Sequence, residues 1–359
     1  MSDNDDYEIP DRDGPTFGIS ITQEQVDQLF SKYLHKTVTS FVEINRGYNN
    51  LLFFVDTDDD EHYVLKVGGR YWKQLKTETE VIALQLVSKY TSVPVPNVVA
   101  WSIDKDEFGI EWIVMTKMNG VPADTLWKND LTTDEKKRIL SELAGYVAQM
   151  KLIPITNKIG NLRFNKDGNY EIGPDLSWNG PWDTFDDFLE GRVRDAVDTL
   201  TKTIFDSVRD EMLQFFNQFK TIIRPTFDVP LTFIHGDLTL QNILISPERQ
   251  ITAILDWEWA GSFPCSEEYF QSYDDIEDKT LKNCFYDELE RQHVQTPRTI
   301  ANFDLIQKLN DFKNDLAPWY LTDLKDPSDP NIMKKLNECK QNVKCLLTEI
   351  KQGCDKNLK

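Results

Sequence analysis

The sequence of 359 residues lacks several features that would assign a class of protein at once. It has no apolar run close to the roughly 18 residues that a membrane span needs, so we expect no membrane partner. Its five cysteines are odd in number and form no Cys-X-X-Cys pair, which argues against a disulfide framework and against a zinc site. The acidic start, MSDNDDYEIPDRDG, has no apolar segment of the kind that secretory signals carry. These absences favour a reducing compartment, with the cytoplasm as the default location.

Positive charge is also scarce. The chain has 40 lysines and arginines against 60 aspartates and glutamates, which gives a formal net charge of −20. A surface that binds nucleic acid carries the opposite sign, so we expect no nucleic acid partner. The acidic excess is compatible with a cationic small substrate, but a solvated acidic surface that aids solubility is the simpler explanation.

Length and composition predict a folded α+β protein of about two structural units. Residues 1–18 are polar and are expected to form a loose leader. We expect a β-rich unit with one long helix over 19–117 and a larger, mostly helical unit over 118–359. The boundary is placed near 117–122, because the segment MNGVP combines glycine and proline.

Hydrophobic periodicity predicts the elements of both units. In the first unit we expect a helix that begins after Thr22 as N-cap, an antiparallel meander of strands, and a second helix over LKTETEVIALQLVSKY. In the second unit we expect helices in 132–153, 207–223 and 331–352, and β-hairpins in 160–173 and 242–256. The last helix carries an apolar stripe through Leu346. It could be a coiled-coil seam, but we favour a helix docked on its own domain because the stripe is short.

The most specific pattern is HGDLTLQN at 235–242, followed by ILDWEWAG at 254–261. A hydroxyl nucleophile needs a carboxylate that orients it and accepts its proton, and we predict Asp237 as this catalytic base. A polyphosphate carries Mg²⁺, which prefers carboxylate and amide oxygens as ligands. Asn242 and Asp256 are the predicted metal ligands, because a tight hairpin brings its two ends together. His235 is expected to brace the loop by hydrogen bonds.

A second set of residues is predicted to bind the nucleotide. Lys66 follows Leu65 on a strand and therefore faces the opposite side, where it needs an anion. Glu80 in the following helix is its favoured ion-pair partner. The turn GYNN tolerates positive φ angles and can point backbone N–H groups at a phosphate. An edge lysine, a solvated glutamate and an ordinary hairpin turn are the simpler alternatives. The predicted nucleotide-binding residues are Gly47, Tyr48, Asn49, Asn50, Lys66, Glu80, Met115, Thr116 and Met118.

From about Phe41 to Tyr273 the chain resembles the aminoglycoside phosphotransferase and choline kinase group of small-molecule kinases. HGDLTLQN and ILDWEWAG carry the resemblance most specifically, with support from INRGYNNLLFFV, VLKV, VPVPNVVAW and IVMTKMNGVP. The resemblance implies a protein-kinase-like fold with a nucleotide-binding N-lobe over 19–117 and a catalytic, acceptor-binding C-lobe over 118–359. It also implies Mg²⁺ and ATP or GTP as co-substrate, with the roles given above for Asp237, Asn242, Asp256 and Lys66. Segments such as GNLRF and DWEWAGSFP look most like fungal phosphotransferase-domain proteins.

Two departures from protein kinases favour a small-molecule acceptor over a peptide. The chain has no GxGxxG loop, and Asp256-Trp257-Glu258 stands where protein kinases have Asp-Phe-Gly. The acceptor stays open among aminoglycoside-, choline- and other amino-alcohol-like hydroxyl compounds. Aromatic residues between 257 and 273 could form a cation–π pocket, although core packing is their more frequent role, and the acids between 267 and 275 could face a cationic acceptor or solvent. A catalytically silent scaffold that binds nucleotide is the alternative function. The presence of all four predicted site residues argues against it, namely Lys66, Asp237, Asn242 and Asp256.

Overall fold

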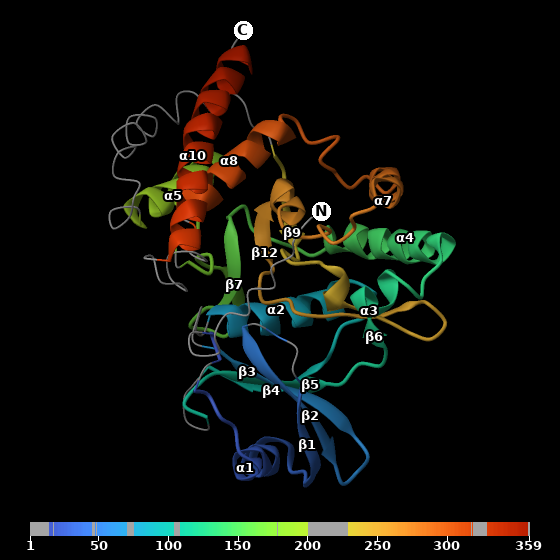
Figure 1. Cartoon of the computed structure of the whole chain (residues 1–359). Coiled ribbons are helices and arrows are strands. Elements are labelled where there is room, and N and C mark those ends of the chain that lie inside the picture. Colours follow the sequence, from blue (N-terminus) through green and yellow to red (C-terminus); the bar gives the residue numbers. More distant parts are fainter. Residues whose placement is uncertain are drawn as a thin grey trace. The chain divides into compact units, whose positions relative to one another are not determined.

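A computed structural model describes residues 14–16, 18–44, 47, 49–69, 75–103, 108–177, 179–199, 229–316, 318 and 329–357. The predicted helix at 207–223 lies outside these described residues, as does most of the predicted leader. The chain forms two compact units. The first contains Met1–Thr77, Val98–Lys117 and Trp319–Met333, and the second contains Glu78–Asn97, Met118–Pro318 and Lys334–Lys359. Figure 1 labels most of their helices and strands.

The first unit is built on a five-stranded sheet of order β1-β2-β3-β5-β4. All its neighbouring strands are antiparallel. Strands β1, β2 and β3 form the predicted meander, and β5 lies between β3 and β4. Alternate residues of these strands face opposite sides, so one face can be apolar while the other carries polar groups. The strands are β1 (Val38–Ile44), β2 (Asn50–Thr57), β3 (His62–Gly68), β4 (Val98–Ser102) and β5 (Trp112–Thr116).

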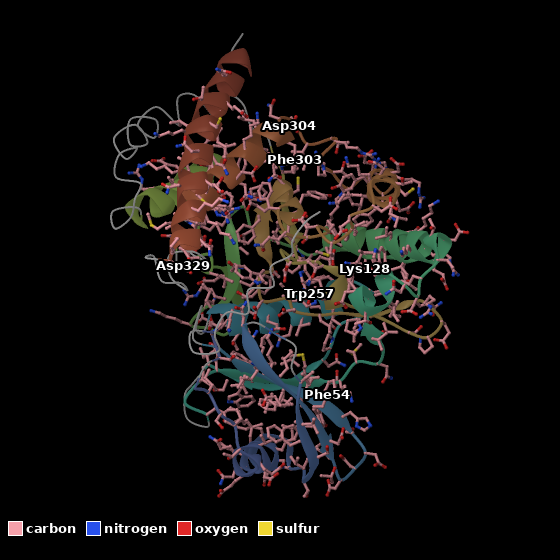
Figure 2. The ribbon with its side chains drawn as sticks, viewed as in Figure 1. Phe54, Lys128, Trp257, Phe303, Asp304 and Asp329 are labelled. Atoms are coloured by element: carbon pink, nitrogen blue, oxygen red, sulfur yellow. The ribbon has the colours of Figure 1, made fainter. Side chains whose placement is uncertain are left out.

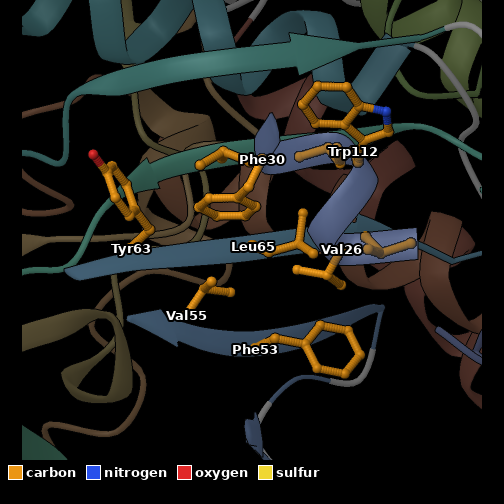
Figure 3. Packing of buried hydrophobic residues seen from close by; sticks show 10 residues of the cluster. Val26, Phe30, Phe53, Val55, Tyr63, Leu65 and Trp112 are labelled. Carbon is orange, nitrogen blue, oxygen red and sulfur yellow. The ribbon is translucent and has the colours of Figure 1, made fainter. Parts of the chain in front are cut away.

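Helix α1 (Gln23–Leu34) covers the apolar face of this sheet. Thr22 is its N-cap and forms a capping box with Gln25, as the Ser/Thr-x-x-Glu/Gln pattern predicts. Phe30 is fully buried and meets Tyr63 edge to face, with ring centroids 5.6 Å apart (Figure 3). Tyr33, on the same helix, is 40% exposed. The buried core of this face consists of Val26, Leu29, Phe30, Phe53, Val55, Tyr63, Leu65, Val67, Trp112 and Val114.

Helix α2 (Leu75–Tyr90) has the bounds that the sequence predicts. Most of its residues are buried, on all sides of the helix. The prolines of VPVP follow it, and Pro94 O accepts a hydrogen bond of 2.8 Å from Ile254 N–H of the second unit's hairpin. From Glu78 onward the helix belongs to the second unit.

The second unit contains most of the described helices. Helix α4 packs against α7, and α5 packs against α8. In α10 the buried stripe includes Leu336, Cys339, Val343, Leu347 and Ile350, so this helix is docked on its own chain. The sequence prediction placed Leu346 in the stripe instead of Leu347, because it followed a heptad. The helices are α3 (Ala123–Trp127), α4 (Thr133–Met150), α5 (Phe185–Thr199), α7 (Lys279–Arg291), α8 (Phe303–Leu316) and α10 (Pro330–Asn357).

Two small sheets complete the second unit, with orders β11-β10-β6 and β8-β7-β12-β9. Both predicted hairpins are present, as β7–β8 and β10–β11. The sequence did not predict that β12 joins the first hairpin to β9. The contact needs glycine, since a Cβ on Gly261 would lie 2.4 Å from Gly160 O. The strands are β6 (Val121–Pro122), β7 (Gly160–Phe164), β8 (Tyr170–Ile172), β9 (Leu231–Ile234), β10 (Ile243–Ile245), β11 (Ile251–Ile254) and β12 (Gly261–Pro264).

A search of the described helices for one long and apolar enough to cross a bilayer finds none.

Candidate active site

The loop that carries the predicted base leaves β9 at Ile234 and runs to η2 (Leu240–Asn242), the short 3-10 helix before β10. Gly236 has a φ of +84°, which glycine adopts without strain. A Cβ at this position would also lie 2.9 Å from Trp259 O. The close approach of the 235–237 backbone to the DWEW segment therefore requires a glycine.

His235 braces this loop from the interior, as the sequence predicts. Its side chain is fully buried, and its Nε2 donates to Leu255 O at 2.9 Å. Its Nδ1 accepts the backbone N–H of Asp237 at 3.2 Å. These two partners assign the neutral tautomer with the proton on Nε2. The ring also packs against Trp257, with centroids 4.4 Å apart. The histidine thus links Asp237 to the end of the hairpin through hydrogen bonds, and both of its ring nitrogens are engaged in them.

Asp237 is held by the side chain of Asn242. The Nδ2 of Asn242 donates to Asp237 O at 2.8 Å and to Asp237 Oδ2 at 3.2 Å. Burial, together with the negative charge of Asp256, raises the pKa of Asp237 to about 7. A carboxylate with a pKa near neutrality is suited to accept a proton at physiological pH. A cation bound by Asp256 would offset the second of these causes.

The β10–β11 hairpin brings Asn242 and Asp256 together. Ile243 pairs with Ile254, and Leu255 N–H donates to Asn242 O at 2.8 Å, so Asp256 comes one residue after the last paired position. Asp256 has a φ of +64°, a left-handed conformation that aspartate tolerates at some cost. Because Asn242 donates through Nδ2, its Oδ1 is the amide atom that can bind a cation. Metal binding by these two residues stays a prediction.

Two further acids gather beside Asp256 in the second unit. Ligand oxygens of Glu80, Asp256 and Glu258 all lie within 4.8 Å of one another. Glu80 and Glu258 are buried, and buried carboxylates are costly unless charges or hydrogen bonds compensate them. Their oxygens are also the ligand type that Mg²⁺ prefers, so the donor set fits a divalent cation. The sequence prediction missed Glu258, and its only signal was a charged residue between two tryptophans.

In the first unit, Lys66 is buried on β3 between Leu52 and Ile113 of the neighbouring strands. It lies on the sheet face opposite the α1 core, as strand alternation predicts. Its contact with phosphates and its ion pair with Glu80 stay predictions. Met115 is buried at the end of β5, and Thr116 and Met118 are half-buried.

The turn predicted to cover the phosphates is fixed by a lysine that sequence reasoning did not single out. Lys76 Nζ donates to Asn50 Oδ1 at 2.7 Å and to Asn49 O at 3.2 Å. Gly47 has a φ of +141°, and a Cβ there would lie 3.0 Å from Asn50 O. Tyr48 lies outside the described residues. Lysine at position 76 thus holds Asn49 and Asn50 against the start of α2.

The aromatic residues of the 257–273 segment are mostly core, which is the simpler of the two predicted roles. Trp257, which is labelled in Figure 2, is fully buried and donates its Nε1–H to Ile254 O at 3.0 Å. Tyr273 is buried against Phe285, with ring centroids 4.9 Å apart, and Tyr269 donates its hydroxyl to Gln295 O at 2.6 Å. These three rings are therefore used for packing and hydrogen bonding within the second unit.

Comparisons with known proteins bear on the fold and the family of the chain. A subtelomeric hrmA-associated cluster protein of Aspergillus fumigatus is 30% identical over 118 residues, which is 33% of this chain and 21% of that relative. The fold is similar to the ADP-bound aminoglycoside phosphotransferase APH(2'')-Ib, with a TM-score of 0.62 at 15% identity over 91% of this chain and 99% of that one. It is also similar to macrolide 2'-phosphotransferase type I, with a TM-score of 0.56 at 12% identity over 90% and 98% of the two chains. These likenesses confirm the protein-kinase-like α+β fold.

A statistical model of the phosphotransferase enzyme family matches residues 40–303. The match includes the HGDLTLQN and DWEW segments and most of both units. Because it spans well over half of the chain, the protein belongs to the phosphotransferase enzyme family.

Proposed function

We propose that the protein transfers the γ-phosphate of a nucleoside triphosphate to a hydroxyl of a small molecule. One observation carries the proposal. Asn242 holds both the backbone carbonyl and the carboxylate of Asp237, while the hairpin that begins at Asn242 ends at Asp256. A base and an acidic cation site are thereby linked through a single amide side chain.

The proposed chemistry assigns one task to each side chain. Asp237 hydrogen-bonds the acceptor hydroxyl and takes its proton, as its pKa near 7 allows. The acceptor oxygen then bonds to the γ-phosphorus. The bond between the γ-phosphorus and the oxygen that bridges the β- and γ-phosphates breaks, and the nucleoside diphosphate leaves. Asn242 fixes the orientation of the Asp237 carboxylate. Asn242 Oδ1 and Asp256 would hold Mg²⁺, which supplies positive charge that neutralises the phosphates when bound.

Nucleotide binding is proposed for Lys66 and the 47–50 turn, which belong to the first unit, and for the segment Met115–Met118, whose last residue belongs to the second. Lys66 is proposed to bind the phosphates, and the 47–50 turn is proposed to cover their other side. The backbone of Met115–Met118 is proposed to contact the nucleobase. The proposal is supported by the buried position of Lys66 and by the turn that Lys76 secures. ATP and GTP both stay candidates, since similar folds include an ADP-bound and a GDP-bound enzyme. The ion pair of Lys66 with Glu80 is part of the same proposal.

The proposed acceptor is an aminoglycoside-, choline- or other amino-alcohol-like compound. The acidic chain, with its net charge of −20, would favour a cationic acceptor over an anionic one. The similar folds include enzymes solved with gentamicin and kanamycin. A cytoplasmic location is also proposed, on the cysteine pattern of the sequence.

A screen for nucleoside diphosphate release tests the function. The purified protein is incubated with Mg²⁺ and ATP or GTP against amino sugars, choline, ethanolamine and macrolides. We expect turnover with at least one acceptor, and Asp237→Asn should lower it by about two to four orders of magnitude while nucleotide binding survives. Full turnover by that variant would refute the assignment of the base. Nucleotide binding without turnover on any acceptor would favour the silent scaffold.

A further inference from the structure

Three polar side chains of the segment after DWEW contact the loop that contains Asp237. It contains η3 (Cys265–Tyr269) and the turns that follow up to Ile276. Glu268 is 5% exposed, and Ser272 is also buried. The acids of this segment were expected to face solvent or an acceptor. Glu268 and Asp275 instead accept hydrogen bonds from the backbone of the loop that contains Asp237.

Glu268 binds the two residues that precede the base. Its Oε2 accepts His235 N–H at 2.8 Å, and its Oε1 accepts Gly236 N–H at 3.2 Å. The hydroxyl of Ser272 donates to the same Oε1 at 2.5 Å. Burial raises the pKa of Glu268, and these donors oppose that shift by stabilising the charged form. An apolar side chain would avoid this desolvation, so the carboxylate is explained by the hydrogen bonds that it accepts.

Ser272 and Asp275 continue the pattern on the other side of the base. Ser272 Oγ accepts Leu238 N–H at 2.7 Å, and Asp275 Oδ2 accepts Leu240 N–H at 2.5 Å. The backbone of the same segment contributes a further bond, from Tyr273 N–H to Leu238 O at 3.0 Å. The contacts thus flank Asp237 on both sides along the chain.

Three other backbone donors of the loop are satisfied locally. Asp237 N–H binds His235 Nδ1, Thr239 N–H binds Asp237 O at 3.0 Å, and Asn242 N–H binds Thr239 O at 3.0 Å. With the bonds to Glu268, Ser272 and Asp275, every backbone N–H from 235 to 240 has an acceptor. A loop with six successive N–H groups committed has little freedom to shift the side chains that it carries.

We propose that Glu268, Ser272 and Asp275 form a loop clamp: three positioning residues that set the place of Asp237 and Asn242 by binding the loop backbone. Glu268 is the central member, because it accepts two successive N–H groups and also orients Ser272. The clamp acts through Asp237 and does not touch the reacting atoms. Its effect on turnover rests on the proposed phosphotransfer, but its effect on the loop does not.

Amide hydrogen exchange of the loop tests the clamp without any acceptor. In Glu268→Gln, one carboxylate oxygen becomes an NH₂ group, which cannot accept an N–H. We expect exchange in the 234–242 segment to accelerate about tenfold to a hundredfold, as for the loss of a charge-assisted hydrogen bond, with α4 unchanged. Glu277→Gln, at an exposed acid just beyond the clamp segment, is the matched control and should change nothing. Unchanged protection of the loop, or equal acceleration in α4, would overturn the clamp.

Milder variants keep the test decisive if Glu268→Gln does not fold. Ser272→Ala removes the acceptor of Leu238 N–H, and Asp275→Asn weakens the acceptor of Leu240 N–H. Each should accelerate exchange of the loop by a smaller factor while the rest of the described chain keeps its protection. Folded Ser272→Ala and Asp275→Asn proteins with wild-type exchange in the loop would contradict the proposal.

Kinetics separate positioning from simple structural support once an acceptor is known. Glu268→Gln should lower kcat by about tenfold to a hundredfold and change the KM for nucleotide by no more than about threefold. Combined with Asp237→Asn it should cause no further loss, because the clamp works through that residue. Full additivity of the two losses, or an unchanged kcat, would refute the positioning role. If no acceptor is found, the exchange result still decides the clamp, so the failure of the proposed function remains distinguishable.

Discussion

Replacing Gly236 with alanine should destabilise the protein more than the same replacement at Gly168. Both glycines have positive φ angles, +84° and +77°. Alanine disfavours this left-handed conformation, so each variant should lose roughly 1–2 kcal/mol of stability. The two sites differ in the space around the added methyl group. At Gly168 no atom lies within 4 Å of the new Cβ. At Gly236 the Cβ would meet Trp259 O at 2.9 Å and Trp259 Cβ at 3.0 Å.

The backbone around Trp259 has little room to yield. The Nδ2 of Asn161 donates to Trp259 O at 3.3 Å and to Ala260 O at 2.9 Å, and Gly261 pairs with Ile234 in the sheet. Overpacking of a fixed site costs about 1–3 kcal/mol, which is the expected excess of Gly236→Ala over Gly168→Ala. Gly236→Ala should therefore unfold at a thermal midpoint several degrees below that of Gly168→Ala. Far-UV circular dichroism measures both midpoints. Equal midpoints for the two variants would show that glycine is needed at position 236 only for its φ angle. The close approach to Trp259 would then impose no cost.

Three further predictions concern the charges and the core. The pKa of Asp237 is raised to about 7, so the folded protein binds more protons than the unfolded chain between about pH 4 and pH 7, and stability falls as pH rises through that window. Asp237→Asn should therefore raise the unfolding midpoint of the metal-free protein more at about pH 8 than at about pH 5; equal gains would contradict the raised pKa. Mg²⁺ should raise the midpoint of the wild-type protein through the Glu80–Asp256–Glu258 cluster, and Asp256→Asn should abolish most of that gain, whereas an undiminished shift would place the ion elsewhere. Phe30→Ala should cost about 3–5 kcal/mol in urea unfolding of the first unit, and a loss as small as that of the exposed Tyr33→Ala would contradict the packing of α1 on the sheet.

Local signals in the sequence were sufficient for the elements that they define. Thr22 and Gln25 fix the start of α1 through a capping box, and prolines fix the end of α2. The 242–256 hairpin follows from two apolar strands joined by a short turn. The juxtaposition of Asn242 with the end of that hairpin could therefore be predicted from the sequence, because both residues belong to one short piece of chain.

Contacts between distant segments could not be predicted in the same way. Lys76, Glu258 and Glu268 look like ordinary helix or turn charges in the sequence, and their roles depend on backbone groups or acids that other segments bring to them. The stripe of α10 shifted from Leu346 to Leu347 because a docked helix follows 3.6 residues per turn instead of the 3.5 of a heptad. Burial by a partner element, and not local preference, decided each of these outcomes.

The β10–β11 hairpin should tolerate inserted residues at its tip but not within its strands. Its tip, between Ser246 and Arg249, lies beyond the paired positions and is largely exposed, so added residues there would leave the pairing of Ile243 with Ile254 intact. A single residue added within β11 would instead turn Asp256 toward the opposite side of the strand and away from Glu80. The tip is therefore a natural point for inserting a fluorescent label or an affinity tag that reports on the site without altering it.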